Sequence, residues 1–109
     1  MIEKQIQKYL PLSESTYYIL LSLVEPRHGY GVMQHVETIS RKSVSIGPGT
    51  LYGAFSNLEK AGLIRAAGEE DRRKYYVLTD LGRNVLAEQI RRLQIMAENG
   101  DEVIPLLEK

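Results

Sequence analysis

Residues 47–61 read GPGTLYGAFSNLEKA, and this stretch decides the fold. Its apolar residues recur at the spacing of one buried helical face: Leu51, Ala54, Phe55 and Leu58. The opposite face is small and polar, and it is formed by Gly49, Gly53, Ser56 and Lys60, with Thr50, Tyr52 and Asn57 beside it. A glycine inside a helix costs about 1 kcal/mol relative to alanine. We therefore expect a helix whose outer face lets a partner approach its backbone closely. The alternative is an ordinary amphipathic helix with a poor outer face.

Composition limits the possible functions. The chain has 109 residues, the size of one domain, and its hydrophobic fraction of 43% is ordinary for a soluble globular protein. Its 14 basic and 14 acidic side chains cancel, so a nucleic-acid role must rest on local clusters of charge. The chain has no cysteine, which excludes disulfides and thiolate metal sites. Without a long apolar run or a signal-peptide layout, the sequence predicts a cytoplasmic protein with no membrane partner.

The first half of the chain predicts helices. Residues 1–10 form a short amphipathic arm with Ile2, Ile6 and Leu10 at steps of four. Ser13 is a candidate N-cap for a largely apolar helix over residues 14–24. A tight corner at residues 26–29 precedes a helix over residues 30–40, and alternation in residues 41–46 predicts a short strand with Val44 and Ile46.

The second half predicts a hairpin and a long helix. Gly62 ends the helix of residues 47–61. Residues 63–67 and 73–79 read as strands joined by a polar turn at residues 68–71. Thr79 caps a helix from residue 80 to about 99, which Asn99 and Gly100 are expected to break, and a further apolar patch follows at residues 103–107.

The predicted fold is mainly α with a small β-hairpin. Residues 1–79 form a winged helix-turn-helix DNA-binding domain with an N-terminal helical arm, and residues 80–109 form a C-terminal dimerisation helix and tail. In this arrangement the helix of residues 47–61 enters the major groove of DNA, and the hairpin lies along the neighbouring phosphates.

Seven motifs occur in the order and spacing of one known family. They are PLSE (residues 11–14), ILL (19–21), HGYG (28–31), GPGTLYG (47–53), LEKAGLI (58–64), DRRKYY (71–76) and LTDLGR (78–83). On these motifs, residues 10–90 strongly resemble the PadR-like transcriptional regulators, and the chain resembles their short subfamily. The resemblance implies a dimeric DNA-binding repressor of bacterial type, in which the C-terminal and N-terminal helices form the dimer. It also implies that an aromatic or drug-like ligand near the dimer interface releases DNA in some members. Because the chain has no Trp, a tryptophan-stacking drug pocket is not supported.

Candidate DNA-binding residues come from the helix of residues 47–61 and from the hairpin. They are Pro48, Gly49, Thr50, Tyr52, Gly53, Ser56, Asn57, Lys60, Arg72, Arg73 and Lys74. The alternative for the three hairpin cations is a solvated tip, and the alternative for Tyr52 is packing against the preceding helix. Arg41 and Lys42 are further candidates for backbone contacts, whereas Tyr30 is expected in the core.

Candidate dimer-interface residues are apolar positions of the arm and of the first and last helices: Ile6, Leu10, Tyr17, Leu21, Leu86, Ile90, Leu93, Met96 and Ala97. A dimer could also enclose a cavity lined by Tyr17, Tyr18, Leu21, Leu93 and Met96, in which a planar molecule shifts the spacing of the reading helices. The alternative is a fully packed interface.

Catalytic and metal chemistry have little support. His28 and His35 are too far apart for one metal ion, and residues 69–71 (Glu-Glu-Asp) read as a turn. No cofactor is expected, and the chain is not expected to be an enzyme. The helical stripe pattern and the resemblance to the PadR-like regulators together predict a homodimeric repressor that binds a near-palindromic operator in double-stranded DNA. The resemblance leaves open whether a small-molecule effector, of unknown identity, acts on it. The rival hypothesis is a winged-helix protein-interaction module that does not bind DNA, which the zero net charge favours.

Overall fold

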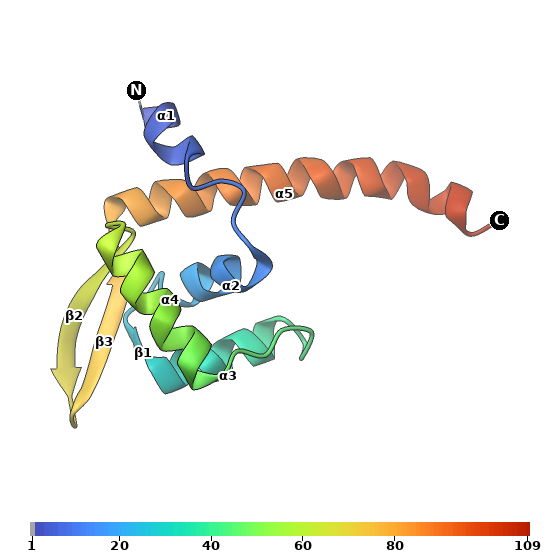
Figure 1. Cartoon of the computed structure of the whole chain (residues 1–109). Coiled ribbons are helices and arrows are strands. Elements are labelled where there is room, and N and C mark those ends of the chain that lie inside the picture. Colours follow the sequence, from blue (N-terminus) through green and yellow to red (C-terminus); the bar gives the residue numbers. More distant parts are fainter. Residues whose placement is uncertain (1) are drawn as a thin grey trace.

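The structure, a computed structural model, describes residues 2–109. Within these described residues, five helices and three strands follow one another: α1 (Ile2–Gln7), α2 (Glu14–Ser22), β1 (Arg27–His28), α3 (Gly29–Ile39), α4 (Pro48–Lys60), β2 (Ile64–Glu70), β3 (Arg73–Leu78) and α5 (Asp80–Leu107). Figure 1 shows α2, α3, α4 and the β2–β3 hairpin grouped on one side of the long α5, which confirms a mainly helical winged helix-turn-helix architecture. No helix in this part of the chain is both long and apolar enough to cross a membrane.

Side-chain caps begin the helices where the sequence predicts them. Ser13 Oγ accepts a hydrogen bond from the Thr16 backbone N–H at 3.1 Å and starts α2. Thr79 Oγ1 accepts from the Gly82 N–H at 3.0 Å and starts α5. Each bond satisfies a backbone donor that the first turn leaves without a helical partner. At the other end of α4, Gly62 has φ of 79°, the left-handed conformation that suits glycine after a helix.

The sheet has one strand more than predicted. Its order is β1–β3–β2, and all pairs are antiparallel, with Arg27 opposite Tyr76 and His28 opposite Tyr75. A two-residue strand carries no periodicity of its own, so the sequence indicated only a corner there. The position of the hairpin turn was also wrong: β2 continues to Glu70 through a bulge near Gly68, and the turn is formed by Asp71 and Arg72. Both turn residues have positive φ, 53° and 67°, as a tight two-residue hairpin turn requires.

The predicted short strand at residues 41–46 is wrong. Val44 and Ile46 are both buried, but they lie in an irregular connection between α3 and α4. Ser40 holds this connection, since its Oγ accepts from the Val44 N–H at 3.1 Å. The alternation of apolar residues and serines therefore arises because Val44 and Ile46 pack inward from a loop, and not because the segment pairs as a strand.

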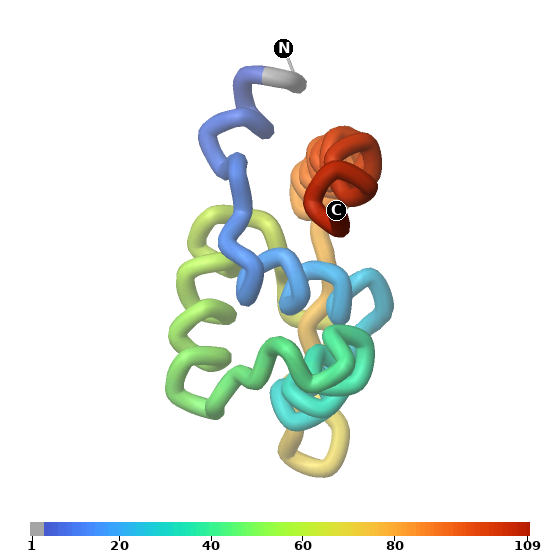
Figure 2. The backbone as a smooth tube through the Cα atoms, turned by 90° about the vertical axis from the view of Figure 1, so that its right-hand side faces the viewer, coloured from blue at the N-terminus to red at the C-terminus, as the bar shows by residue number. Residues whose placement is uncertain are grey.

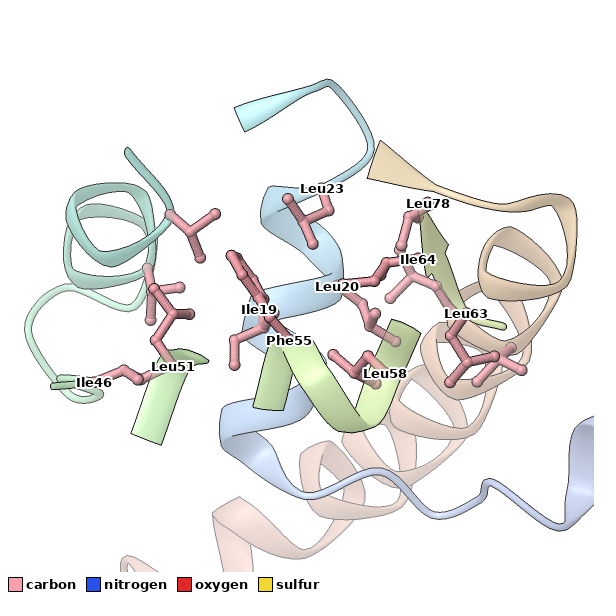
Figure 3. Packing of buried hydrophobic residues seen from close by; sticks show 14 of the residues in the cluster. Ile19, Leu20, Leu23, Ile46, Leu51, Phe55, Leu58, Leu63, Ile64 and Leu78 are labelled. Carbon is pink, nitrogen blue, oxygen red and sulfur yellow. The ribbon is translucent and has the colours of Figure 1, made fainter. Parts of the chain in front are cut away.

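Helix α2 lies at the centre of the core. Figure 3 shows Ile19 and Leu20 of α2 against Leu51, Phe55 and Leu58 of α4, with residues of β2 and β3 on the other side. All the labelled side chains in this view are buried: Ile19, Leu20, Leu23, Ile46, Leu51, Phe55, Leu58, Leu63, Ile64 and Leu78. The predicted apolar face of α4 is thus confirmed.

Helix α5 is longer than predicted and carries on beyond the domain. It passes through Asn99 and Gly100, the expected break, and ends at Leu107 with Pro105 in its last turn. A single glycine costs only about 1 kcal/mol, and Pro105 lies too near the end to interrupt many hydrogen bonds. The helix packs on α1 and α2 near its start, whereas residues 94–109 are all exposed. Figures 1 and 2 show it crossing above α2 and extending past the other helices.

The β2–β3 hairpin is the wing of this fold. A close backbone contact fixes the start of α5 against the residue that precedes this wing. Gly82 lies on the Leu63 carbonyl oxygen, and a Cβ at this position would overlap that oxygen. The same carbonyl accepts a hydrogen bond from the Thr79 N–H at 3.0 Å. Only a glycine therefore allows α5 to leave the sheet in this direction. The proposed division into residues 1–79 and 80–109 stays a prediction.

Candidate nucleic-acid interface

The outer face of α4 is exposed along its whole length. Burial of Leu51, Phe55 and Leu58 turns the opposite side to solvent, and that side comprises Pro48, Gly49, Thr50, Tyr52, Gly53, Ser56, Asn57 and Lys60. A Cβ placed on Gly49 or Gly53 would meet nothing within 4 Å. Packing inside the chain therefore does not require either glycine. Each glycine lowers the stability of the helix, and no contact within the chain requires it. Two such glycines on one exposed face are consistent with close approach by the backbone or base edge of a partner.

Tyr52 packs against the preceding helix and also remains accessible. Its ring meets Phe55 edge-on at 6.0 Å between centroids, and 54% of the residue is exposed. The hydroxyl end rests on Gly29 at the start of α3, where a Cβ would lie 2.7 Å from the Tyr52 Cζ. Gly29 thus admits the tyrosine, which is held with its hydroxyl beside α3.

The wing places three cationic side chains near Tyr52 of α4. Arg72, Arg73 and Lys74 are exposed at and after the hairpin turn. Strand register sets Glu70 opposite Arg73 and Glu69 opposite Lys74. Within the residues that the structure describes, none of these three cations forms an ion pair. They are available for phosphate contacts, although the neighbouring carboxylates reduce the local positive charge.

A cleft of about 380 Å³ connects α3, α4 and the wing. It is lined by His28, Gly29, Tyr30, Tyr52, Arg72, Arg73, Lys74 and Tyr76. Neither His28 nor Tyr76 is among the site residues predicted from the sequence, which places His28 in a tight corner before a helix and otherwise offers it only as a metal ligand. The available signal was the position of His28 directly before a helix, where a side-chain acceptor acts as an N-cap.

Tyr30 is not in the core, contrary to the prediction. It is 56% exposed, and its hydroxyl accepts a hydrogen bond from Gln34 Nε2 at 3.1 Å. Tyr30 precedes the buried Val32 by two positions, which is about 200° around a helix, so it faces away from the packed stripe.

Arg41 and Lys42 follow Ser40, the C-cap of α3, in the connection that leads to α4. Both are exposed and both have positive φ, 54° and 65°. Their assignment to DNA-backbone contacts stays a prediction. Among the described residues, no group of three or more His, Asp or Glu could hold a metal ion.

A second hollow lies between α2 and α5. It has a volume of about 350 Å³ and is lined by Pro11, Leu12, Glu14, Tyr17, Tyr18, Gln89, Leu93 and Met96. Four of the five residues predicted for an effector cavity line it; Leu21 does not. Gln89 is buried, and its Oε1 accepts from the Leu12 N–H at 2.8 Å. Burial, with a contribution from Tyr18, raises the pKa of Tyr17 above its ordinary value.

The predicted dimer residues differ in how much surface they leave. Ile6 and Leu86 are already buried within the single chain. Met96 and Ala97 are exposed, and the rest are half-buried: Leu10, Tyr17, Leu21, Ile90 and Leu93. Further along α5, large apolar side chains are exposed at Val103, Ile104, Leu106 and Leu107. The apolar patch predicted at residues 103–107 therefore lies exposed on the distal part of α5, beyond the predicted dimer residues.

Comparison with known proteins gives a family. The model of the Transcriptional regulator PadR-like family matches residues 18–88. The structure of smu.1704 from Streptococcus mutans UA159 is 31% identical, with a TM-score of 0.68 over 89% of this chain and 93% of that one. A transcriptional regulator from Clostridium thermocellum is 25% identical, with a TM-score of 0.64 over 91% of this chain and 96% of that one. A 37.1 kDa protein of transposon TN4556 from Streptomyces fradiae is 35% identical over 75 residues, which are 68% of this chain and 21% of that protein. The chain thus matches about a fifth of the length of this last relative.

Replacing Gly53 with alanine separates stability from recognition. Because the new Cβ meets nothing within the chain, Gly53→Ala should raise the free energy of unfolding by up to about 1 kcal/mol. The same methyl group would stand between α4 and a closely approaching DNA, so affinity for DNA should fall. Denaturant unfolding and a DNA titration of the same preparation measure both effects. Unchanged affinity in a stabilised variant would contradict close approach at Gly53.

Proposed function

Because the chain belongs to the PadR-like family of transcriptional regulators, we propose that it is a sequence-specific DNA-binding protein that acts as a homodimeric repressor. The observation that carries the proposal is the outer face of α4, which is exposed, small and polar around Gly49 and Gly53. A helix of this shape can lie deep in a major groove, as recognition helices of helix-turn-helix proteins do.

Base reading is assigned to the polar side chains of this face. Thr50, Ser56 and Asn57 are exposed and carry hydroxyl or amide groups. An amide can make two hydrogen bonds to adenine, and hydroxyl groups can bond to several base edges. Arg72, Arg73 and Lys74 are assigned to phosphates, which position the protein without reading sequence.

Dimerisation is assigned to α5 together with the arm. Met96 is 64% exposed, and the apolar side chains from Val103 to Leu107 continue the same helix. A single chain leaves this surface in water, and a second copy would cover it. Two copies of α4 would then read two half-sites of a near-palindromic operator about one helical turn apart.

Control by a small molecule is assigned to the hollow between α2 and α5. Its aromatic and apolar lining, Tyr17, Tyr18, Leu93 and Met96, suits a planar apolar molecule, and Glu14 and Gln89 supply polar groups. Because the hollow lies on the helix assigned to dimerisation, an occupant could change the spacing of the two reading helices. It would act only through different affinity for the two arrangements.

Two sets of substitutions distinguish phosphate contacts from base reading. The operator is first isolated by selecting genomic fragments that the protein binds, beginning with DNA upstream of its own coding region. The double variant Arg72→Ala/Arg73→Ala should weaken binding to operator and random DNA alike. It should also reduce the slope of log affinity against log salt by the amount expected for about two phosphate contacts. Asn57→Ala should instead cost about 1–3 kcal/mol on the operator and little on random DNA. Equal loss on both DNAs would remove Asn57 from the reading residues. A wild-type protein with no affinity for any DNA would favour the interaction module.

A charge on the exposed part of α5 tests the dimer. Met96→Asp should leave each chain folded, because Met96 contributes little to the single-chain core, and it should convert a dimer to monomers. Sedimentation measures the mass, and circular dichroism verifies the fold. Gln94→Asp, a similar change at another exposed position of α5, is the control. A wild-type protein that stays monomeric at high concentration would contradict the assignment.

Filling the hollow tests the effector proposal. A panel of planar phenolic compounds is added to the protein–operator complex, and at least one compound should release the DNA. Leu12→Trp, which fills part of the hollow from a position outside the predicted dimer residues, should still bind the operator but should no longer respond to that compound. If no compound of the panel changes operator affinity, the hollow is not an effector site for this class.

A further inference from the structure

His28 uses its inner ring nitrogen to cap α3. Its Nδ1 accepts a hydrogen bond from the Gly31 backbone N–H at 3.2 Å, and its backbone is extended, as expected of an N-cap residue. A ring nitrogen that accepts a hydrogen bond carries no proton. In a neutral imidazole the proton then lies on the other nitrogen, Nε2.

The outer nitrogen faces a second donor. Arg73 Nη1 lies 3.3 Å from His28 Nε2. A guanidinium group only donates hydrogen bonds, and a neutral imidazole accepts through one nitrogen only. The cap has already used that nitrogen, so the Nε2–H of His28 and an N–H of Arg73 point into the same space without an acceptor between them. Protonating the ring does not help, because both nitrogens would then be donors and the cap would be lost.

The ring is also held in place. Tyr75 contacts it edge-on, with centroids 5.3 Å apart, and the ring of Tyr30 lies parallel to it at 6.4 Å. Arg73, in contrast, is an exposed side chain on the wing and can move. Two hydrogen-bond donors therefore face each other, one on a fixed histidine and the other on a mobile arginine.

An anionic acceptor would satisfy both donors at once. The cleft beside them, about 380 Å³, is also lined by Tyr52, Arg72 and Lys74, and no carboxylate is among its lining residues in the described part of the chain. The cleft lies between the start of α3, α4 and the wing, where a DNA backbone would pass if α4 enters the major groove. We propose that His28, through its Nε2–H, binds a phosphate of the DNA backbone jointly with Arg73. This inference rests on the proposed function, and it adds a neutral donor at the N-cap of α3 to the cationic contacts of the wing.

The variant His28→Asn isolates the outer nitrogen. The Asn Oδ1 can replace Nδ1 as the cap, so the fold should be kept, while nothing replaces Nε2–H. With a random-sequence duplex of about two helical turns as the probe, His28→Asn should bind roughly tenfold more weakly than the wild type. Because a neutral donor releases no counterion, the slope of log affinity against log salt should stay the same between about 50 and 200 mM. Arg73→Ala should lower that slope by about one phosphate contact.

Two further measurements complete the test. The loss in the double variant His28→Asn/Arg73→Ala should be smaller than the sum of the single losses, because both side chains bind one phosphate. Nitrogen NMR of the free protein should find the proton of His28 on Nε2, and this resonance should shift when the duplex is added. His35→Asn, at the other histidine, is the control for loss of an imidazole; its ring bonds Ser22 Oγ between α2 and α3.

The outcomes separate the inference from the proposed function. Wild-type affinity in His28→Asn, or a proton found on Nδ1, would overturn the inference while leaving DNA binding intact. A reduced salt slope in His28→Asn would also overturn it, because the histidine would then act as a cation. A wild-type protein that fails to bind the duplex at low salt would overturn both. Weaker binding with an unchanged slope and an Nε2 proton supports the inference.

Discussion

The burial of one face of α4 is the constraint on which the rest depends. Leu51 and Phe55 are almost completely inaccessible, at 0% and 2% exposure, and Leu58 is buried beside them. Burying each such side chain contributes about 1.5–3 kcal/mol, which exceeds the cost of about 1 kcal/mol for each glycine in the helix. Because residues advance about 100° along a helix, seating these three side chains also fixes where Gly49 and Gly53 point. The core thus sets the orientation of the surface and leaves its composition free for binding.

Helix α3, helix α4 and the wing are joined into one surface by contacts at the start of α3. Pairing of β1 with β3 sets His28 opposite Tyr75, and Gly29 gives the Tyr52 ring room to lie against α3. The cleft between these elements is lined by residues far apart in the sequence, from His28 to Tyr76. A ligand that binds there would contact three elements at once, so its position relative to α4 would be fixed by the fold.

Local signals predicted the helices and the wing well. The apolar period of residues 47–61 and the caps Ser13 and Thr79 indicated the right elements, because each signal acts within one or two helical turns. Features that depend on distant partners could not be predicted in this way. Strand β1 exists only because β3 runs beside it, and Val44 and Ile46 are buried by packing and not by pairing.

The same distinction explains the mixed outcome for the site. The exposed face of α4 followed from its buried face, so the candidate reading residues do lie on the exposed side, and their contact with DNA stays a prediction. His28 was missed, since its cap and its contact with Arg73 appear only when α3 and the wing are brought together. The continuation of α5 beyond Gly100 shows the opposite error, in which a local break signal was weaker than the helix-forming residues around it.

The most direct test of the central claim is a map of the protein surface that DNA contacts. A genomic fragment that the protein binds is first shortened to the region that the protein protects from cleavage. Backbone amide resonances of the labelled protein are then followed by NMR while this DNA is added. If α4 and the wing bind DNA, the largest shifts should occur at the start of α3, along α4 and in the turn between β2 and β3, with small shifts in the last half of α5. Shifts centred on α5, with α4 unaffected, would contradict the central claim.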